Sequence, residues 1–139
     1  MAQKISGRSK KLNRRETHDL DVKISFMEGI VRRDTRYVDA LQLLGDFYSQ
    51  RGRYDQSLHV DEQLSLLEPG NPMVFYNLAC SHSLNCNFDQ AAAALEHALS
   101  LGYRDFKWLS RDPDLKQLRK HPVYRPIARK IRAMRVKVP

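Results

Sequence analysis

The chain has 139 residues, of which 42% are hydrophobic and 29% charged, with a formal net charge of +8 at pH 7. This composition suits one folded domain or a short repeat array and excludes a fully disordered chain. The longest apolar run, Ala91–Leu95, is far too short to span a bilayer, so no integral membrane segment is expected. Two cysteines and no secretion signal near Met1 favour free thiols in a reducing, cytoplasmic setting.

The charges are distributed unevenly along the chain. Residues 1–15 carry six lysines and arginines and residues 116–139 carry nine, and neither segment contains an acidic residue. All sixteen acidic residues lie in 16–115, where they outnumber the nine basic ones. The sequence therefore predicts an acidic body with two basic ends, a feature that concerns partners and solubility rather than fold.

The first two segments are predicted to be a tail and a helix. In residues 1–17 the basic residues are spaced among Ser, Gly, Gln and Asn, and beyond Met1 only Ile5 and Leu12 are sizeable apolar residues. This segment is predicted to be disordered on its own. Apolar residues at helical spacing follow at Leu20, Ile24 and Ile30, so residues 18–37 are predicted to form an N-terminal capping helix.

The next two segments, 38–71 and 72–105, are related by an offset of 34 residues. Their similarity lies in side-chain size, as packing requires, rather than in identity. The same offset relates Leu20 to Tyr54 and Ile24 to Leu58 in the preceding segment. The matched pairs between the two units are Leu41 and Phe75, Leu44 and Leu78, Gly45 and Ala79, Tyr54 and Phe88, Ser57 and Ala91, and Leu64 and Ala98.

Each unit is predicted to be a helix–turn–helix. In the first unit the apolar spacing is helical on both sides of Gly52, which marks the turn between two antiparallel helices. Pro69 and Gly70 end this unit, and Pro72 suits the first turn of the next helix, where its missing N–H costs nothing. In the second unit His82 replaces Tyr48, and Cys86 replaces the turn glycine.

With Leu44-Gly45, Tyr48, the small Ser57 and Pro69 at these spacings, the unit 38–71 resembles a tetratricopeptide repeat, and 72–105 resembles a looser second copy. The resemblance implies an all-α fold, a short α-solenoid of about six to eight helices in antiparallel pairs. It also implies that 18–37 is half of an earlier repeat and that 106–139 is a degenerate repeat with a basic C-terminal capping helix. Small residues at Gly45 and Ser57 are expected where the two helices cross closely.

The resemblance further implies a non-enzymatic scaffold that binds a peptide or a partner helix in a concave groove, with the partner differing between family members. The first helix of each repeat would line this groove. The groove residues expected from the repeat register are Gln42, Asp46, Ser49, Met73, Tyr76, Asn77, Cys80, Lys107 and Arg111.

No arrangement of residues indicates catalysis, a metal or a cofactor. Cys80 and His82 point about 200° apart on a helix, so they cannot share one ion, and His82 with Cys86 offers only two ligands. Asp112-Pro113-Asp114 is typical of turn and helix-start chemistry rather than of a catalytic carboxylate pair. The six glycines form no phosphate-binding loop, and we therefore expect no enzyme.

The alternative function is binding of nucleic acid or the ribosome through the basic ends. Ile127, Ile131 and Met134 mark one face of a basic amphipathic helix whose apolar side is expected to cover the last repeat. The sequence also leaves open a homodimer formed through incompletely capped end helices. The candidate polyanion-binding residues are Lys4, Arg8, Lys10, Lys11, Arg14, Arg15, Arg125, Arg129, Lys130, Arg132 and Arg135.

Overall fold

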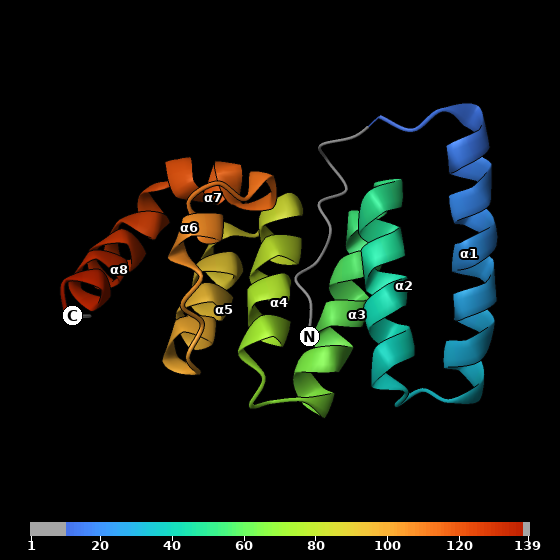
Figure 1. Ribbon diagram of the computed structural model, residues 1–139, viewed down its shortest axis with the longest axis horizontal. Coiled ribbons are helices and arrows are strands. Elements are labelled where there is room, and N and C mark those ends of the chain that lie inside the picture. The colour runs from blue at the N-terminus through green and yellow to red at the C-terminus, as the bar shows by residue number, and fades with distance from the viewer. Residues whose placement is uncertain (1–10, 138–139) are drawn as a thin grey trace.

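The computed structural model describes residues 11–137, and this part of the chain is all-helical with no strand (Figure 1). It therefore confirms the predicted fold class and helix number. No helix in these residues is long and apolar enough to cross a membrane. The elements in chain order are α1 (Arg14–Arg33), α2 (Val38–Arg51), α3 (Tyr54–Leu67), α4 (Pro72–Leu84), α5 (Phe88–Ser100), α6 (Phe106–Leu109), the 3-10 turn η1 (Pro113–Leu115), α7 (Lys116–Lys120), the 3-10 turn η2 (Pro122–Tyr124) and α8 (Arg125–Lys137).

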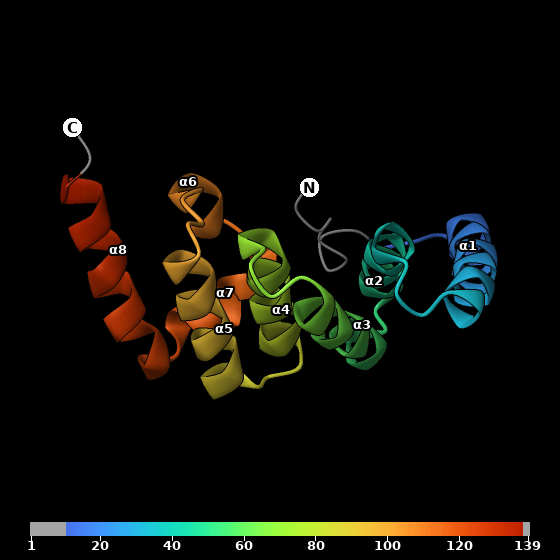
Figure 2. The same ribbon diagram turned by 90° about the horizontal axis from the view of Figure 1, so that it is seen from below.

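The helices form a short solenoid in which each long helix from α1 to α5 packs against the next one along the chain. Figure 1 shows α1 to α5 standing in one row, and Figure 2 shows α1 and α8 at opposite ends of it. The apolar core has two parts. One joins α1, α2 and α3, with Val74 from α4, and the other joins α4 and α5 with the C-terminal elements. The molecule is thus built by stacking rather than around one centre.

The first helix begins at Arg14, inside the segment 1–17 that was expected to be a disordered tail. Asn13 and Glu16 form a capping box: the Asn13 side chain accepts from the Glu16 backbone N–H at 2.8 Å, and the Asn13 N–H donates to the Glu16 carboxylate at 3.4 Å. This cap satisfies N–H groups that would otherwise lack partners at the helix start. The remainder of the expected tail, residues 1–10, lies outside the described residues.

The helices α2 and α3 approach each other closely at Gly45, as the small residues predicted. The Ser57 hydroxyl donates to the Gly45 carbonyl at 3.1 Å across the pair. A Cβ atom added at Gly45 would lie 3.4 Å from both the Val60 and the Asp61 side chains, which leaves little room for a larger residue. Small residues at these two positions therefore set the spacing of the hairpin.

The C-terminal elements fold back over the second half of the stack. Leu109, Leu115 and Leu118 are fully buried, and η1 packs against α4. Ile127 and Ile131 of α8 belong to the same core, so the apolar face of this helix is buried there. The α4–α5 end of the stack is closed by these residues.

The turns of the two hairpins each contain a residue with positive φ, and the two residues are 34 positions apart. Gly52 has φ of 83° and Cys86 has φ of 60°, and both values are left-handed. Among the described non-glycine residues, only Cys86 has a positive φ. A side chain in this conformation is strained, whereas glycine adopts it readily.

We expect Cys86→Gly to raise the free energy of unfolding by about 0.5–1 kcal/mol, because relief of strain outweighs the entropy that glycine adds to the unfolded chain. The opposite substitution in the first turn, Gly52→Cys, should lower the free energy of unfolding by about 1 kcal/mol. Urea denaturation of both variants beside the parent protein measures the two shifts. A destabilised Cys86→Gly variant would contradict this account of the turn.

Candidate partner-binding groove

A groove of about 260 Å³ lies between α2, α3 and α4. It brings together three of the residues expected from the repeat register, Gln42, Asp46 and Asn77, although they lie on two different helices. Asp39, one turn before Gln42 on α2, extends the same wall. The full set of lining residues is Asp39, Gln42, Leu43, Asp46, Asp61, Leu64 and Asn77. We call this surface the acidic groove.

The acidic groove has one sign of charge. Three aspartates line it, and among the described residues no lysine or arginine does. Asp39 is exposed and Asp46 half-buried, whereas Asp61 is buried and accepts a hydrogen bond from the Ser81 hydroxyl of α4. Leu43 and Leu64 supply apolar surface between the polar groups. Aspartates facing a confined space attract cations strongly, so the groove is suited to a ligand that is basic and partly apolar.

Four of the expected groove residues are buried. Asn77, which is 8% exposed, still lines the acidic groove, whereas Ser49, Tyr76 and Cys80 do not, which corrects the sequence-based assignment. Tyr76 and Cys80 are each 1% exposed, because η1 packs over the face of α4 that was expected to stay open. Ser49 is fully buried on α2. Residues beneath neighbouring elements cannot contact a partner, so these three are structural.

The remaining expected groove residues lie away from the acidic groove. Met73 is half-buried and packs against the second core. Lys107 in α6 and Arg111 after it are exposed. They belong to the closing elements and do not line the groove between α2, α3 and α4.

A single carboxylate, that of Asp112, ties the closing elements to α4. Its Oδ2 accepts from the Tyr76 hydroxyl at 2.6 Å and from the Cys80 thiol at 3.6 Å, and its Oδ1 accepts from the Asp114 backbone N–H at 3.0 Å. Burial raises the pKa of Tyr76 and the neighbouring Cys80 and Asp112 add to the effect, so the hydroxyl remains a donor. Arg119 also donates to the Asp112 backbone carbonyl at 2.8 Å.

Asp112, Cys80 and Asp114 have the donor types of a metal site, with their ligand atoms within 4.8 Å of one another. In this protein both Asp112 oxygens already accept hydrogen bonds. The cluster therefore serves as a structural contact between η1 and α4. Sequence reasoning identified the turn chemistry of Asp112 but not its contact with α4, because the bonded residues are 36 positions apart.

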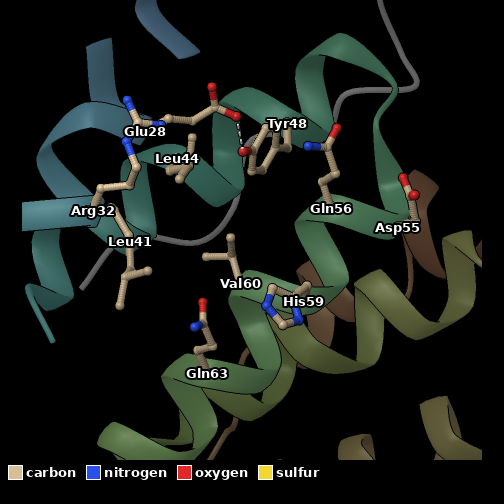
Figure 3. Close-up of a pocket in the computed structure, with 11 residues that line it drawn as sticks. Glu28, Arg32, Leu41, Leu44, Tyr48, Asp55, Gln56, His59, Val60 and Gln63 are labelled. Atoms are coloured by element: carbon tan, nitrogen blue, oxygen red, sulfur yellow. Dashed lines mark hydrogen bonds between the residues drawn. The ribbon is translucent and has the colours of Figure 1, made fainter. Parts of the chain in front are cut away.

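A second, larger pocket of about 530 Å³ lies between α1, α2 and α3, lined by other residues than the acidic groove. In Figure 3, Arg32 and Glu28 of α1 face Asp55, Gln56 and His59 of α3 across an apolar floor. The Tyr48 hydroxyl donates to Glu28 Oε2 at 2.5 Å and so links α1 to α2. Burial, reinforced by this bond to Glu28, raises the pKa of Tyr48. No candidate site residue was expected here, because the sequence indicates only mixed polarity on α3.

His82 occupies the place that Tyr48 has in the first unit. Its burial between the helices lowers its pKa, against the opposing influence of Glu62 and Asp61. The ring Nδ1 lies 3.4 Å from the Asn87 amide nitrogen at the turn. His82 is thus a packing residue held near the hairpin turn.

The basic residues of α8 are exposed as far as Arg135. Lys130 pairs with Glu96 at 3.4 Å across the surface. Of the N-terminal candidates, Lys11, Arg14 and Arg15 are exposed at the start of α1, whereas Lys4, Arg8 and Lys10 lie outside the described residues. The exposed cations of α8 are Arg125, Arg129, Lys130, Arg132 and Arg135.

No family model matches the chain. Over 83 residues, 58% of the chain, it is 35% identical to a chloroplast protein of the plant Arabidopsis thaliana. The matched region corresponds to about 25% of the length of that plant protein.

We expect Asp112→Ala to lower the free energy of unfolding by about 2–4 kcal/mol, because it leaves the buried Tyr76 hydroxyl without an acceptor and releases η1 from α4. Combined with Tyr76→Phe, the loss should be less than additive by roughly 0.5–3 kcal/mol. A double-mutant cycle by urea denaturation measures this coupling. Asp19→Ala, at an exposed position of α1, is the control and should change stability by less than about 0.5 kcal/mol.

Proposed function

We propose that this protein is a non-enzymatic interaction module of the tetratricopeptide-repeat type, which holds a partner segment in the acidic groove. The observation that carries the proposal is the convergence of Asp39, Gln42 and Asp46 from α2 with Asn77 from α4 on one groove. A groove formed by successive first helices of a repeat stack is a common place to bind an extended peptide or a helix.

The helix positions support the repeat assignment. The helices α2 and α4 begin at Val38 and Pro72, and α3 and α5 begin at Tyr54 and Phe88, each pair one 34-residue period apart. The left-handed turn residues Gly52 and Cys86 keep the same period. The conformational repeat therefore follows the sequence repeat in both helices and in the turn.

The charge of the groove indicates the chemistry of the partner. Asp39 and Asp46 favour lysine or arginine, and Leu43 and Leu64 favour an apolar side chain beside them. The partner segment is thus basic with interspersed apolar residues. Lys107 and Arg111 lie on the closing elements, outside this groove, and are not required for the contact.

A second candidate function is polyanion binding by α8. The observation that favours it is the division of this helix into a buried apolar side and five exposed cations. Because Ile127 and Ile131 are used in the core, the helix is held in place while its cations face solvent. Such a surface suits the phosphates of RNA without reading bases.

We propose a reducing location such as the cytoplasm. Neither Cys80, which is buried, nor Cys86, which is exposed, forms a disulfide. Thiols in this state are typical of reducing compartments.

Selection of random peptides displayed on phage against the full chain tests the groove. We expect enriched peptides to combine lysine or arginine with a large apolar residue. The double variant Asp39→Lys, Gln42→Lys should bind these peptides at least about tenfold more weakly, because it removes one aspartate from the groove and places two cations there. Asp89→Lys, at an exposed position of α5 outside the groove, is the control and should bind as the parent does. Equal binding by the groove variant would contradict the proposal.

Polyanion binding is tested by the triple variant Arg129→Ala, Arg132→Ala, Arg135→Ala. In fluorescence anisotropy with a single-stranded RNA of about 20 nucleotides, we expect weaker binding and a salt dependence shallower by about 2 in log–log slope. A triple alanine variant of Arg32, Arg33 and Arg36, which are exposed at the other end, controls for net charge. If both triple variants lose affinity equally, α8 is not the binding site.

A further inference from the structure

The α1–α2 end of the stack has an exposed apolar surface that shares only Leu43 with the acidic groove. It is a shallow hollow of about 390 Å³. Phe26 is 67% exposed, Val22 55% and Leu43 47%, so three of the six exposed large apolar side chains in the described residues gather here. We call this hollow the end groove; its lining residues are Val22, Lys23, Phe26, Met27, Leu43 and Phe47. Clusters of exposed apolar residues usually mark interaction sites.

The surface equivalent to the end groove, one repeat further along the stack, is covered by a helix. One period after Phe26, Met27, Leu43 and Phe47 stand Val60, Asp61, Asn77 and Ser81, all of which are buried. Three of them lie against α2: Asp61 and Asn77 line the acidic groove together with α2, and a Cβ atom added at Gly45 in α2 would lie 3.4 Å from the Val60 and Asp61 side chains. In the inner repeat, a helix therefore packs over the surface that is open at the α1–α2 end.

No helix precedes α1 within residues 11–137, so the end groove lacks this cover in the described part of the chain. Two other segments of the chain fit it poorly. Residues 1–13 contain few apolar side chains among their many cations. In α8, Ile127 and Ile131 are already buried, and the exposed side is mostly cationic.

The helix α1 has the features needed to fill the end groove of a second copy. Val22 and Phe26 lie one turn apart and form an exposed ridge at the groove itself. A twofold interface requires such self-complementarity, with ridge and groove on one surface. A helix of 20 residues, about 30 Å long, also offers length for extended helix packing.

The charges at the end groove are compatible with this arrangement. Lys23 is the only charged residue among the lining residues, and its ammonium lies 5.8 Å from the centre of the Phe47 ring. Its long stem can remain on the ring while the charge reaches solvent. Packing two copies at this surface therefore buries apolar groups without burying a pair of carboxylates.

We propose that two copies of the chain associate through their α1–α2 ends about a twofold axis, with Val22 and Phe26 of each copy packed into the end groove of the other. The interface does not depend on the function proposed for the acidic groove. Because the contact is apolar and the chain carries a net charge of +8, added salt strengthens it by screening repulsion.

Sedimentation velocity of the full chain, from about 1 to about 200 µM, tests the proposal. We expect a concentration-dependent species of twice the 16.2 kDa chain mass, which persists in about 0.5 M salt. Phe26→Glu should weaken association at least about tenfold, since it places a carboxylate in the apolar contact. Leu66→Glu is the matched control, because Leu66 is 83% exposed on α3, outside the end groove, and this variant should dimerise as the parent does. Circular dichroism verifies that both variants are folded.

Cross-linking provides an independent measurement. In a Cys86→Ser background, Val22→Cys should form an intermolecular disulfide under mild oxidation much faster than Leu66→Cys. A monomer at every concentration would overturn the proposal and assign the end groove to a helix of another protein. A dimer that dissociates in about 0.5 M salt and is insensitive to Phe26→Glu would also overturn it, in favour of pairing between basic ends and the acidic groove.

Discussion

Each helical hairpin of this chain can bury its apolar residues only by packing against a neighbouring hairpin, and the other features of the structure follow from this requirement. Within a hairpin, close approach at Gly45 and Ser57 sets the distance between the helices. Between hairpins, α4 packs on α3 and takes part in both halves of the core. The stack has two ends where the repetition stops. At each end there is no further hairpin in the described residues to cover the apolar side chains.

The two ends differ in how far their apolar side chains are covered. At the α4–α5 end, the closing elements cover the core and are held to α4 by the carboxylate of Asp112, while the cations of α8 face solvent. At the α1–α2 end, Val22 and Phe26 remain exposed and leave a surface suited to a second copy. The acidic groove lies between these ends. The acidic groove and α8 carry charges of opposite sign, whereas the end groove is mainly apolar.

The sequence by itself determined the all-α class, the 34-residue period and the hairpin turns, because these depend on local spacing and on backbone preferences at single positions such as Gly52. Of the residues that the repeat register predicted for a partner groove, Gln42, Asp46 and Asn77 line one groove in the structure. The sequence also contains a local signal for the start of α1 at Arg14, namely the Asn13–Glu16 capping pair. The prediction did not use this signal and began the helix at residue 18.

Only the tertiary structure decided which side of α4 is accessible. The repeat register predicted that Tyr76 and Cys80 face a partner, but the closing elements, more than 30 residues later in the chain, cover them. The same fold-back gives Asp112 its role, and the absence of a preceding helix within the described residues leaves Phe26 exposed. Local patterns specify helices and turns, whereas the burial of a helix face depends on which distant segment packs against it.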